Sequence, residues 1–284
     1  MQEIRKLPGV GIEIDIDLAT CSDEELREFG KKIPQEGFVL VRNQNLHESQ
    51  IVSVCESIGR LSKPDLYCMN QDYPGLFQVT NEVRDGKKIG VFTDKELDWH
   101  SNGNGRPTGR ESCVGLYCVK PGINSVTSVC DLRSAYADLS EDLREIINNV
   151  DCLFKFKNGT FYQFDEDDEL LSIFEGHSDN EGVIKNLVFD HPWTGEKVIY
   201  FAFHTIREMW RRDGEDLSED WLRETLLEHI LKEKYIYHHD NWREGDFLFM
   251  DQFHTIHKRN AVEGERFLYR TCFDYENLTD IQVQ

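Results

Sequence analysis

The sequence lacks several features that would place it in a well-known class. None of its 8 cysteines forms a Cys-x-x-Cys pair, the spacing typical of zinc ribbons and thioredoxin-like redox sites. No apolar run approaches the ~20 residues that cross a bilayer. The opening residues, Met-Gln-Glu-Ile-Arg-Lys, lack the apolar stretch of a secretory signal. We therefore expect a cytoplasmic protein with free thiols.

Positive charge is also scarce. The chain has 32 Lys and Arg against 53 Asp and Glu, which gives a formal net charge of −21. Proteins that bind nucleic acid without sequence preference neutralise phosphates with Lys and Arg, and docking on an anionic membrane needs the same charges. We expect neither partner. We expect a small-molecule substrate, and the composition leaves a homo-oligomer open.

No linker, internal repeat or low-complexity tract divides the chain. One domain over residues 1–284 is therefore the predicted organisation. A capping box, Ser22 with Glu25, opens a predicted helix near the start. The expected early elements are a strand at 10–18, a helix from 22 to about 33, a strand at 37–42 and a helix at 47–58.

Strands and helices alternate less regularly in the rest of the chain. Lys120-Pro121-Gly122 is expected to turn the chain, and Leu139, Leu143 and Ile146 are expected on one helix face. Residues 81–95 are predicted to form either a lid or a plain hairpin, and 103–109 and the acidic run 165–169 to be loops. The other expected elements are strands at 76–81, 112–118, 125–129, 197–203 and 247–250, helical structure at 134–149, and a helix from Asp216 or Ser218 to about 232.

The segment Asp98-Trp99-His100-Ser101-Asn102 carries a candidate metal motif. A His-x-Asp or His-x-Glu pair completed by a distant His is the facial triad of non-heme Fe(II) oxygenases. Here Asn102 takes the position of the acid. Residues two apart on a strand share a face, so His100 and Asn102 could hold one metal. His257 is the preferred third ligand and His254 the second choice; two unrelated histidines are the alternative.

Arg266 and Arg270 lie four residues apart in an aromatic run, Arg-Phe-Leu-Tyr-Arg. On a strand both would face one side, with Phe267 and Tyr269 on the other. An unpaired buried charge is costly, and a guanidinium binds a carboxylate through two parallel hydrogen bonds. The pair therefore indicates a site for carboxylates, with two ordinary ion pairs as the alternative.

Taken together and in order, these segments resemble the taurine dioxygenase (TauD/TfdA) family of Fe(II)/2-oxoglutarate-dependent oxygenases. The resemblance covers most of the chain. The segments that carry it are Gly37–Gln44, Trp99-His100, Thr127, Tyr136–Ser140, His191–Lys197, Gly245–Gln252, His257, and Arg266 with Arg270.

The resemblance implies a mainly β protein with flanking helices, folded as a double-stranded β-helix, which is a cupin-like jelly roll. It also implies Fe(II), 2-oxoglutarate and O2 as cofactor and co-substrates. The implied metal ligands are His100, Asn102 and His257, and the implied 2-oxoglutarate contacts are Thr127 and Arg266. Arg270 is expected to hold an anionic substrate, and Asn81 and Phe203 to line its pocket.

The resulting hypothesis is a dioxygenase that hydroxylates a small carboxylate or sulfonate. Asn102 leaves four explanations open: an engineered change, a natural variant that holds iron through the amide oxygen, a halogenase with chloride in place of the acid, or a non-catalytic binding homologue. The adjacent histidines His238 and His239 point to opposite faces of a strand, so we expect them to be structural or surface residues.

Overall fold

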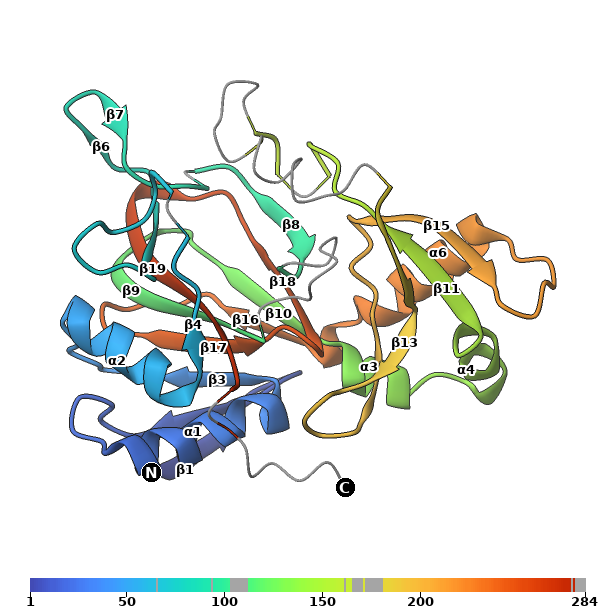
Figure 1. Ribbon diagram of the computed structural model, residues 1–284, viewed down its shortest axis with the longest axis horizontal. Helices are drawn as coiled ribbons and strands as arrows, with labels where there is room; N and C mark the ends of the chain where they lie inside the picture. The colour runs from blue at the N-terminus through green and yellow to red at the C-terminus, as the bar shows by residue number, and fades with distance from the viewer. Residues whose placement is uncertain are drawn as a thin grey trace.

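The computed structural model describes residues 1–64, 66–92, 94–102, 112–160, 162–164, 171, 181–276 and 278. The loops expected at 103–109 and 165–169 lie outside these residues. Figure 1 shows two sheets of the described chain at the left, with helices below them, and a lobe at the right.

The larger sheet is mostly antiparallel and has the order β1-β2-β3-β17-β9-β19-β4, with β5 also paired to β19. Only β2 and β3 run parallel, because a helix connects them. Its strands are β1 (Gln2–Lys6), β2 (Ile12–Asp15), β3 (Phe38–Val41), β4 (Arg60–Leu61), β5 (Phe77–Thr80), β9 (Cys113–Ile123), β17 (Phe247–Asp251) and β19 (Glu263–Asp274).

The smaller sheet has the order β16-β10-β18-β8. It packs across from the larger sheet, and apolar side chains from both sheets form one core between them. Its strands are β8 (Leu97–His100), β10 (Thr127–Asp131), β16 (Ile236–His239) and β18 (Thr255–Arg259).

The alternation of side chains along β17 explains why helices cover the outer face of the larger sheet. Leu248 and Met250 point into the core between the sheets, whereas Phe247 and Phe249 point outward into a second core. Two helices, α1 (Asp23–Glu36) and α2 (Glu48–Ile58), supply the other side of that core; the ring of Phe29 on α1 lies 5.2 Å from that of Phe249. Successive strand residues face opposite sides, so a continuous apolar strand must be buried on both faces.

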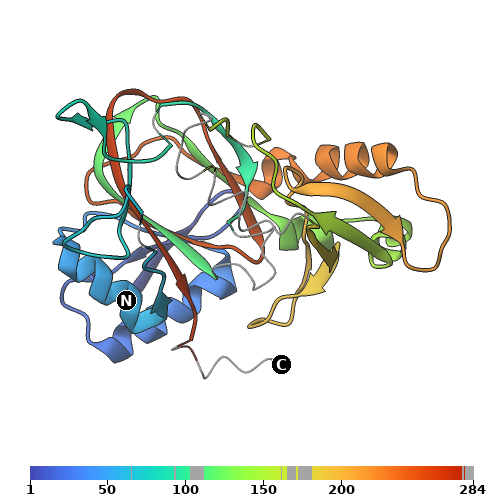
Figure 2. The same ribbon diagram turned by 45° about the horizontal axis from the view of Figure 1, so that its top comes forward.

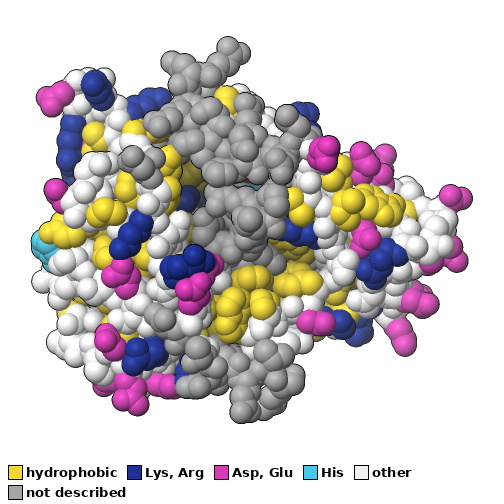
Figure 3. Space-filling view, in the orientation of Figure 1, with side chains coloured by type: hydrophobic (Ala, Val, Ile, Leu, Met, Phe, Trp, Pro, Cys, Tyr) yellow, Lys and Arg dark blue, Asp and Glu magenta, His cyan; other side chains and the backbone are white. Residues whose placement is uncertain are grey.

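A third core lies behind the smaller sheet and fills the lobe that projects in Figure 2. Several acidic side chains lie along the outer edge of this lobe (Figure 3). Its elements are α3 (Leu132–Ala137), α4 (Glu141–Ile147), β11 (Val150–Phe154), β12 (Val183–Asn186), β13 (Val188–Asp190), β14 (Lys197–Ile199), β15 (Ile206–Arg211), α6 (Glu219–Ile230) and the 3₁₀ turn η1 (Glu233–Tyr235). Among the described residues, every helix is too short or too polar to span a bilayer.

Several local predictions are confirmed. The Ser22–Glu25 capping box is present at the start of α1, and α2 ends before Gly59. Residues 81–95 contain a hairpin of β6 (Val83–Arg84) and β7 (Lys87–Lys88). His239 is buried and bonded to Asp246, while His238 faces solvent beside Glu233.

Other predictions are wrong in ways that local sequence cannot reveal. The chain does not turn at Lys120-Pro121-Gly122, because β9 continues to Ile123 and its pairing with β19 shifts register near the proline. Such irregularities are where a sheet accommodates proline. The helical structure expected at 134–149 is present as two helices, but Leu139 lies between them and so does not share a helix face with Leu143 and Ile146. Of the two caps offered for α6, Ser218 is confirmed.

Two strand ranges are also shorter than expected. The strand expected at 10–18 is only Ile12–Asp15, and the one expected at 197–203 ends at Ile199. The strand expected at 247–250 is β17, which ends at Asp251, and a turn leads from it into β18, which carries His257.

Candidate metal centre and its pocket

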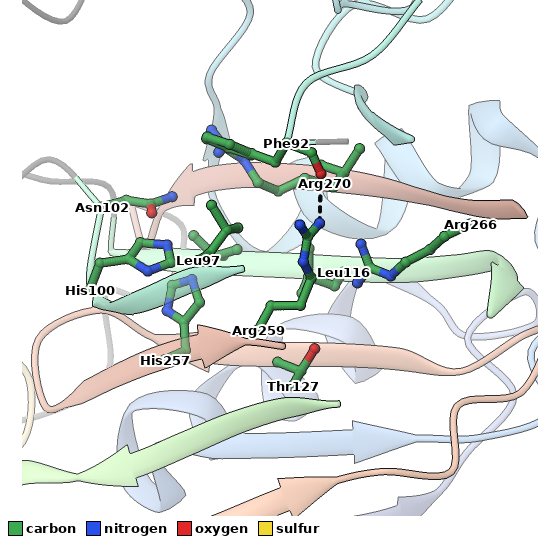
Figure 4. Close-up of a pocket in the computed structure, with 12 residues that line it drawn as sticks. Phe92, Leu97, His100, Asn102, Leu116, Thr127, His257, Arg259, Arg266 and Arg270 are labelled. Atoms are coloured by element: carbon green, nitrogen blue, oxygen red, sulfur yellow. Dashed lines mark hydrogen bonds between the residues drawn. The ribbon is translucent and has the colours of Figure 1, made fainter. Parts of the chain in front are cut away.

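A pocket opens between the two sheets, and Figure 4 shows the side chains that line it. One part of the lining is apolar and the other carries imidazole, amide, hydroxyl and guanidinium groups. The lining residues are Val79, Phe92, Leu97, His100, Asn102, Val114, Leu116, Thr127, His257, Arg259, Arg266 and Arg270. Six of the eight residues assigned to the site from the sequence are among them.

His100 and His257 meet because neighbouring strands place them opposite each other. His100 ends β8 and pairs with His257 of β18 in the antiparallel register. Directly opposed side chains on one face of such a pair are close neighbours, and the two ring centroids are 4.2 Å apart. Two imidazoles at this spacing can bind one metal ion from adjacent strands.

Both imidazoles are in the chemical form that binds metals. Burial is the main reason that the pKa of His100 falls to about 4, and the charges of Arg270 and Arg259 act in the same direction. Burial likewise lowers the pKa of His257 well below its usual value. The Nδ1 of His100 lies 2.6 Å from the carbonyl oxygen of Asp98. Nδ1–H donates a hydrogen bond to that carbonyl, which fixes the tautomer in which Nε2 carries the lone pair that can bind a metal.

Asn102 lies beyond the end of β8, in a turn, and still reaches the pocket. The shared face expected for residues two apart on one strand is therefore not the reason that it does so. Its backbone N–H donates to the side-chain oxygen of Gln252 (2.9 Å), and its amide nitrogen lies 3.8 Å from the sulfur of Cys272. In Figure 4 the amide oxygen lies on the side of the His100 ring and the nitrogen points away from it. The oxygen is the end of an amide that can bind a metal.

Thr127 and Arg266 lie at the other end of the pocket from Asn102 (Figure 4). Both are buried, and neither the hydroxyl oxygen of Thr127 nor Nε of Arg266 has a hydrogen-bond partner in the described protein. Burial lowers the pKa of Arg266 to about 9, so the guanidinium is charged at neutral pH. Buried polar groups normally have partners, and a carboxylate would supply one to both residues.

Arg270 follows Arg266 by four residues along β19, and both residues line the pocket. Leu268 lies between them on the same face, whereas Phe267 and Tyr269 point into the core on the helix side. This alternation is the one predicted from the sequence. The guanidinium carbon of Arg270 is 4.4 Å from the centre of the Phe77 ring, so an aromatic face fixes its position.

Arg259 is a lining residue that the sequence analysis missed. It follows His257 by two residues on β18, and this spacing places both on the pocket face. One guanidinium nitrogen donates to the carbonyl oxygen of Phe92 at 2.6 Å, and the other donates to that of Lys95. Arg259 thus ties the segment before β8 to β18. Its distance of two residues from a candidate ligand was the signal that could have identified it.

Two residues assigned to the substrate pocket do not line it. The Asn81 amide bridges β5 to β19, donating to the carbonyl of Gly264 and accepting from the N–H of Arg266. Phe203 packs against the core of the lobe, beside Phe201. Asn81 still positions the backbone that carries Arg266, but its side chain is engaged by backbone groups.

A second cluster, formed by His191, Asp251 and His254, also has metal-like geometry, with ligand atoms within 4.8 Å of one another. Its hydrogen bonds argue for a structural role. His191 Nδ1 accepts from the backbone N–H groups of Trp193 and Thr194, so Nε2 holds the proton and faces the Asp251 carboxylate at 3.3 Å. A protonated nitrogen cannot bind a metal.

The Asp251 carboxylate is occupied by other donors as well. It accepts from the backbone N–H groups of Phe253 and His254 and from the hydroxyl of Tyr275. The cluster therefore fixes the turn between β17 and β18. His254 lies in this cluster and not among the residues that line the pocket, which separates the two histidines that the sequence offered as the late ligand.

Known proteins resemble the chain over most of its length. A family model described as "Taurine catabolism dioxygenase TauD, TfdA family" matches residues 3–272. The alpha-ketoglutarate-dependent 2,4-dichlorophenoxyacetate dioxygenase of Burkholderia sp. (strain RASC) is 24% identical over 271 residues, covering 88% of this chain and 85% of that protein. Pentalenolactone F synthase of Streptomyces avermitilis is 23% identical over 294 residues, covering 96% and 94%.

Among solved structures, that of AAD-2 in complex with Mn(II) and N-oxalylglycine aligns with a TM-score of 0.71 and 20% identity, covering 96% of this chain and 97% of that one. This likeness confirms the predicted fold, a mainly β jelly roll of the cupin-like kind with flanking helices. Members of the matched family use Fe(II), 2-oxoglutarate and O2. The chain belongs to the TauD, TfdA family of 2-oxoglutarate-dependent oxygenases.

Proposed function

We propose that this oxygenase hydroxylates a small substrate with an apolar body and a carboxylate or sulfonate group, using iron held by His100, Asn102 and His257. The observation that carries the proposal is the pair of opposed imidazoles, 4.2 Å apart between their centroids. They share a pocket with the buried guanidinium of Arg266 and the buried hydroxyl of Thr127. Nε of Arg266 and the hydroxyl oxygen of Thr127 have no hydrogen-bond partner among the described residues.

The residues of the pocket fit an Fe(II) ion and 2-oxoglutarate. Two neutral imidazoles and one amide oxygen are a nitrogen and oxygen donor set that suits iron. Thr127 and Arg266 suit the carboxylate at the far end of the co-substrate, because a hydroxyl and a guanidinium can both donate to it. When bound, Fe(II) with 2-oxoglutarate and O2 supplies the oxidation that adds an oxygen atom to the substrate and leaves succinate and CO2.

The chain's own residues then select and orient the substrate. Arg270 lines the same pocket as the two imidazoles, and its charge would hold an anionic group beside the metal site. Val79, Phe92 and Leu97 offer apolar surface and exclude water from the reacting carbon. The relative named for 2,4-dichlorophenoxyacetate acts on a molecule of this kind, an aromatic body with a carboxylate.

One domain over residues 1–284, a cytoplasmic location and a homo-oligomer all stay predictions.

A turnover assay tests the proposed function. The protein is incubated with Fe(II), ascorbate, 2-oxoglutarate and O2, together with a panel of aryl and alkyl carboxylates and sulfonates. We expect succinate release that depends on an anionic compound and matches its hydroxylated product mole for mole. His100→Ala is the negative control. Release that is equal with neutral amide analogues, or absent with every compound, contradicts the proposal.

A further inference from the structure

The charges around the pocket are unusual for a site that takes a metal ion. Three of its lining residues, Arg259, Arg266 and Arg270, carry guanidinium groups, and none of the described lining residues is Asp or Glu. Arg259 and Arg266 are only 4% and 2% exposed, so water screens their charges poorly. The described pocket therefore has a strongly positive interior.

All three candidate metal ligands are neutral donors. His100 and His257 bind through neutral imidazoles, and Asn102 offers an amide oxygen in the position where the facial triad has a carboxylate. A carboxylate would attract a divalent cation at short range with an interaction on the order of several kcal/mol at the low effective dielectric of a buried site. The protein alone therefore supplies ligand atoms for the metal ion but no negative charge to balance the charge of the ion.

The same pocket suits a dianion without any metal. Arg266 is buried, and the hydroxyl of Thr127 and Nε of Arg266 lack hydrogen-bond partners in the described protein. Folding has already removed water from these two groups, and the folded chain bears that free-energy cost. A carboxylate can therefore bind them without a further cost for dehydrating them. The dicarboxylate then brings negative charge to within reach of His100 and His257.

We propose that the pocket binds its divalent metal and its dicarboxylate as a coupled pair, in which the dicarboxylate binds without metal and supplies the negative charge that Asn102 does not. This inference rests on the proposed function, because it uses the same residues as ligands. Coupling of this kind is reciprocal: the factor by which the dicarboxylate tightens metal binding equals the factor by which the metal tightens dicarboxylate binding.

Calorimetry on the metal-free protein tests the coupling without any turnover. Mn(II) serves as a redox-silent metal and N-oxalylglycine as a dicarboxylate that is not consumed. We expect N-oxalylglycine to bind the metal-free protein measurably, and saturating N-oxalylglycine to tighten Mn(II) binding by at least about tenfold. Acetate at the same ionic strength should not. An Mn(II) affinity that N-oxalylglycine leaves unchanged overturns the proposal.

Asn102→Asp is the matched variant, because it changes one amide to a carboxylate of the same shape. We expect it to bind Mn(II) tightly without N-oxalylglycine, so that the coupling factor falls toward one. Arg266→Gln should lose N-oxalylglycine binding and with it the gain in Mn(II) affinity, while Mn(II) binding by the protein alone is not weakened. An Asn102→Asp protein that keeps the full coupling factor contradicts the proposal, as does one that binds neither ligand.

These outcomes separate the coupling from the proposed function. Cooperative binding without substrate-dependent succinate release would support the proposed coupling and contradict the proposed function. Succinate release by a protein that binds Mn(II) equally tightly with and without N-oxalylglycine would support the proposed function and contradict the proposed coupling.

Discussion

Asn102 decides how this pocket differs from a facial triad with an acid. Its backbone is held by Gln252 and its amide nitrogen lies beside the sulfur of Cys272, so the amide oxygen is left on the side of the imidazoles (Figure 4). An amide oxygen is a weaker donor than a carboxylate because it carries no formal charge. The Asn102 side chain can therefore offer an oxygen to a metal ion, but it adds no negative charge to balance that of the ion.

Arg270 gives the first prediction. Arg270→Ala removes a cation that we expect to pair with the substrate's anionic group, so KM for the substrate should rise about 10- to 100-fold, as for a lost charge-assisted hydrogen bond. Turnover of 2-oxoglutarate without substrate should be nearly unchanged, because Thr127 and Arg266 remain. Steady-state kinetics with both readouts measures this split. Equal loss of both activities would assign Arg270 to the co-substrate instead.

At the scale of single elements, β18 contributes more to the pocket than its length suggests. It places His257 beside His100 and then Arg259 two residues later. Arg259 donates to two backbone carbonyls of the segment before β8. That segment also carries Phe92, which lines the pocket and whose ring contacts Tyr162 and Phe164. β18 therefore joins the candidate metal site to a segment that lines the same pocket.

The second prediction concerns this tie. Arg259→Met keeps an apolar stem but removes both hydrogen bonds, so residues 91–95 should open more easily, by roughly 1–3 kcal/mol of local stability. Amide hydrogen exchange in that segment should become faster, and KM for substrate should rise. Lys258→Met is the control, because the neighbouring Lys258 packs over Trp99 on the opposite face. Unchanged exchange in the Arg259 variant would show that the aromatic contacts alone hold the segment.

The turn between β17 and β18 gives the third prediction. Asp251 is fully buried and accepts from His191, Tyr275 and two backbone N–H groups. Asp251→Asn removes a charged acceptor and leaves donors unpaired, which should cost roughly 2–4 kcal/mol of unfolding free energy.

Urea denaturation measures this cost, with Asp190→Asn as the control. Asp190 pairs with Lys197 at an exposed position, so its change should stay within about 0.5 kcal/mol. Equal small effects at both positions would mean that the Asp251 cluster is not a structural centre.

The sequence predicts the parts of the fold that depend on local pattern. The capping box at Ser22 and the alternation around Arg266 and Arg270 are local signals, and both appear as expected. The continuation of β9 through Pro121 depends on its partner β19, which is more than a hundred residues away. Arg259 looks like a surface cation beside Lys258 until the pairing of β18 is known. Asn81 and Phe203 had no spacing argument, and neither lines the pocket.

At the scale of the whole molecule, three apolar cores surround the two sheets of the described chain, and a partly polar pocket lies between these sheets. The pocket opens between the sheets, so residues from β8, β18, β10 and β19 converge on it although they span 170 residues of sequence. The net charge of the chain is −21, whereas the described lining of the pocket contains three arginines and no Asp or Glu. The net charge therefore does not describe the site.

Buried histidines give a prediction for the whole chain. Burial lowers the pKa of His100 and of His254 to about 4, below the value of about 6.5 expected in the unfolded chain. Between these values the unfolded state binds more protons, so stability should fall as pH falls from about 6.5 toward 4, by roughly 1.4 kcal/mol per pH unit for each histidine. Urea denaturation of the metal-free protein at several pH values measures the slope. A stability that is the same at pH 7 and pH 5 would contradict this expectation.

The most direct test of the account is an anaerobic titration of the protein with Fe(II) and 2-oxoglutarate, followed by the visible absorption band of an iron-bound keto acid. We predict a band in the unaltered protein that disappears in His100→Ala and in His257→Ala and persists in His254→Ala, since His254 belongs to the Asp251 cluster. A band that survives loss of His100 and His257, or that is lost only with His254, would contradict the assignment of the metal to this pocket.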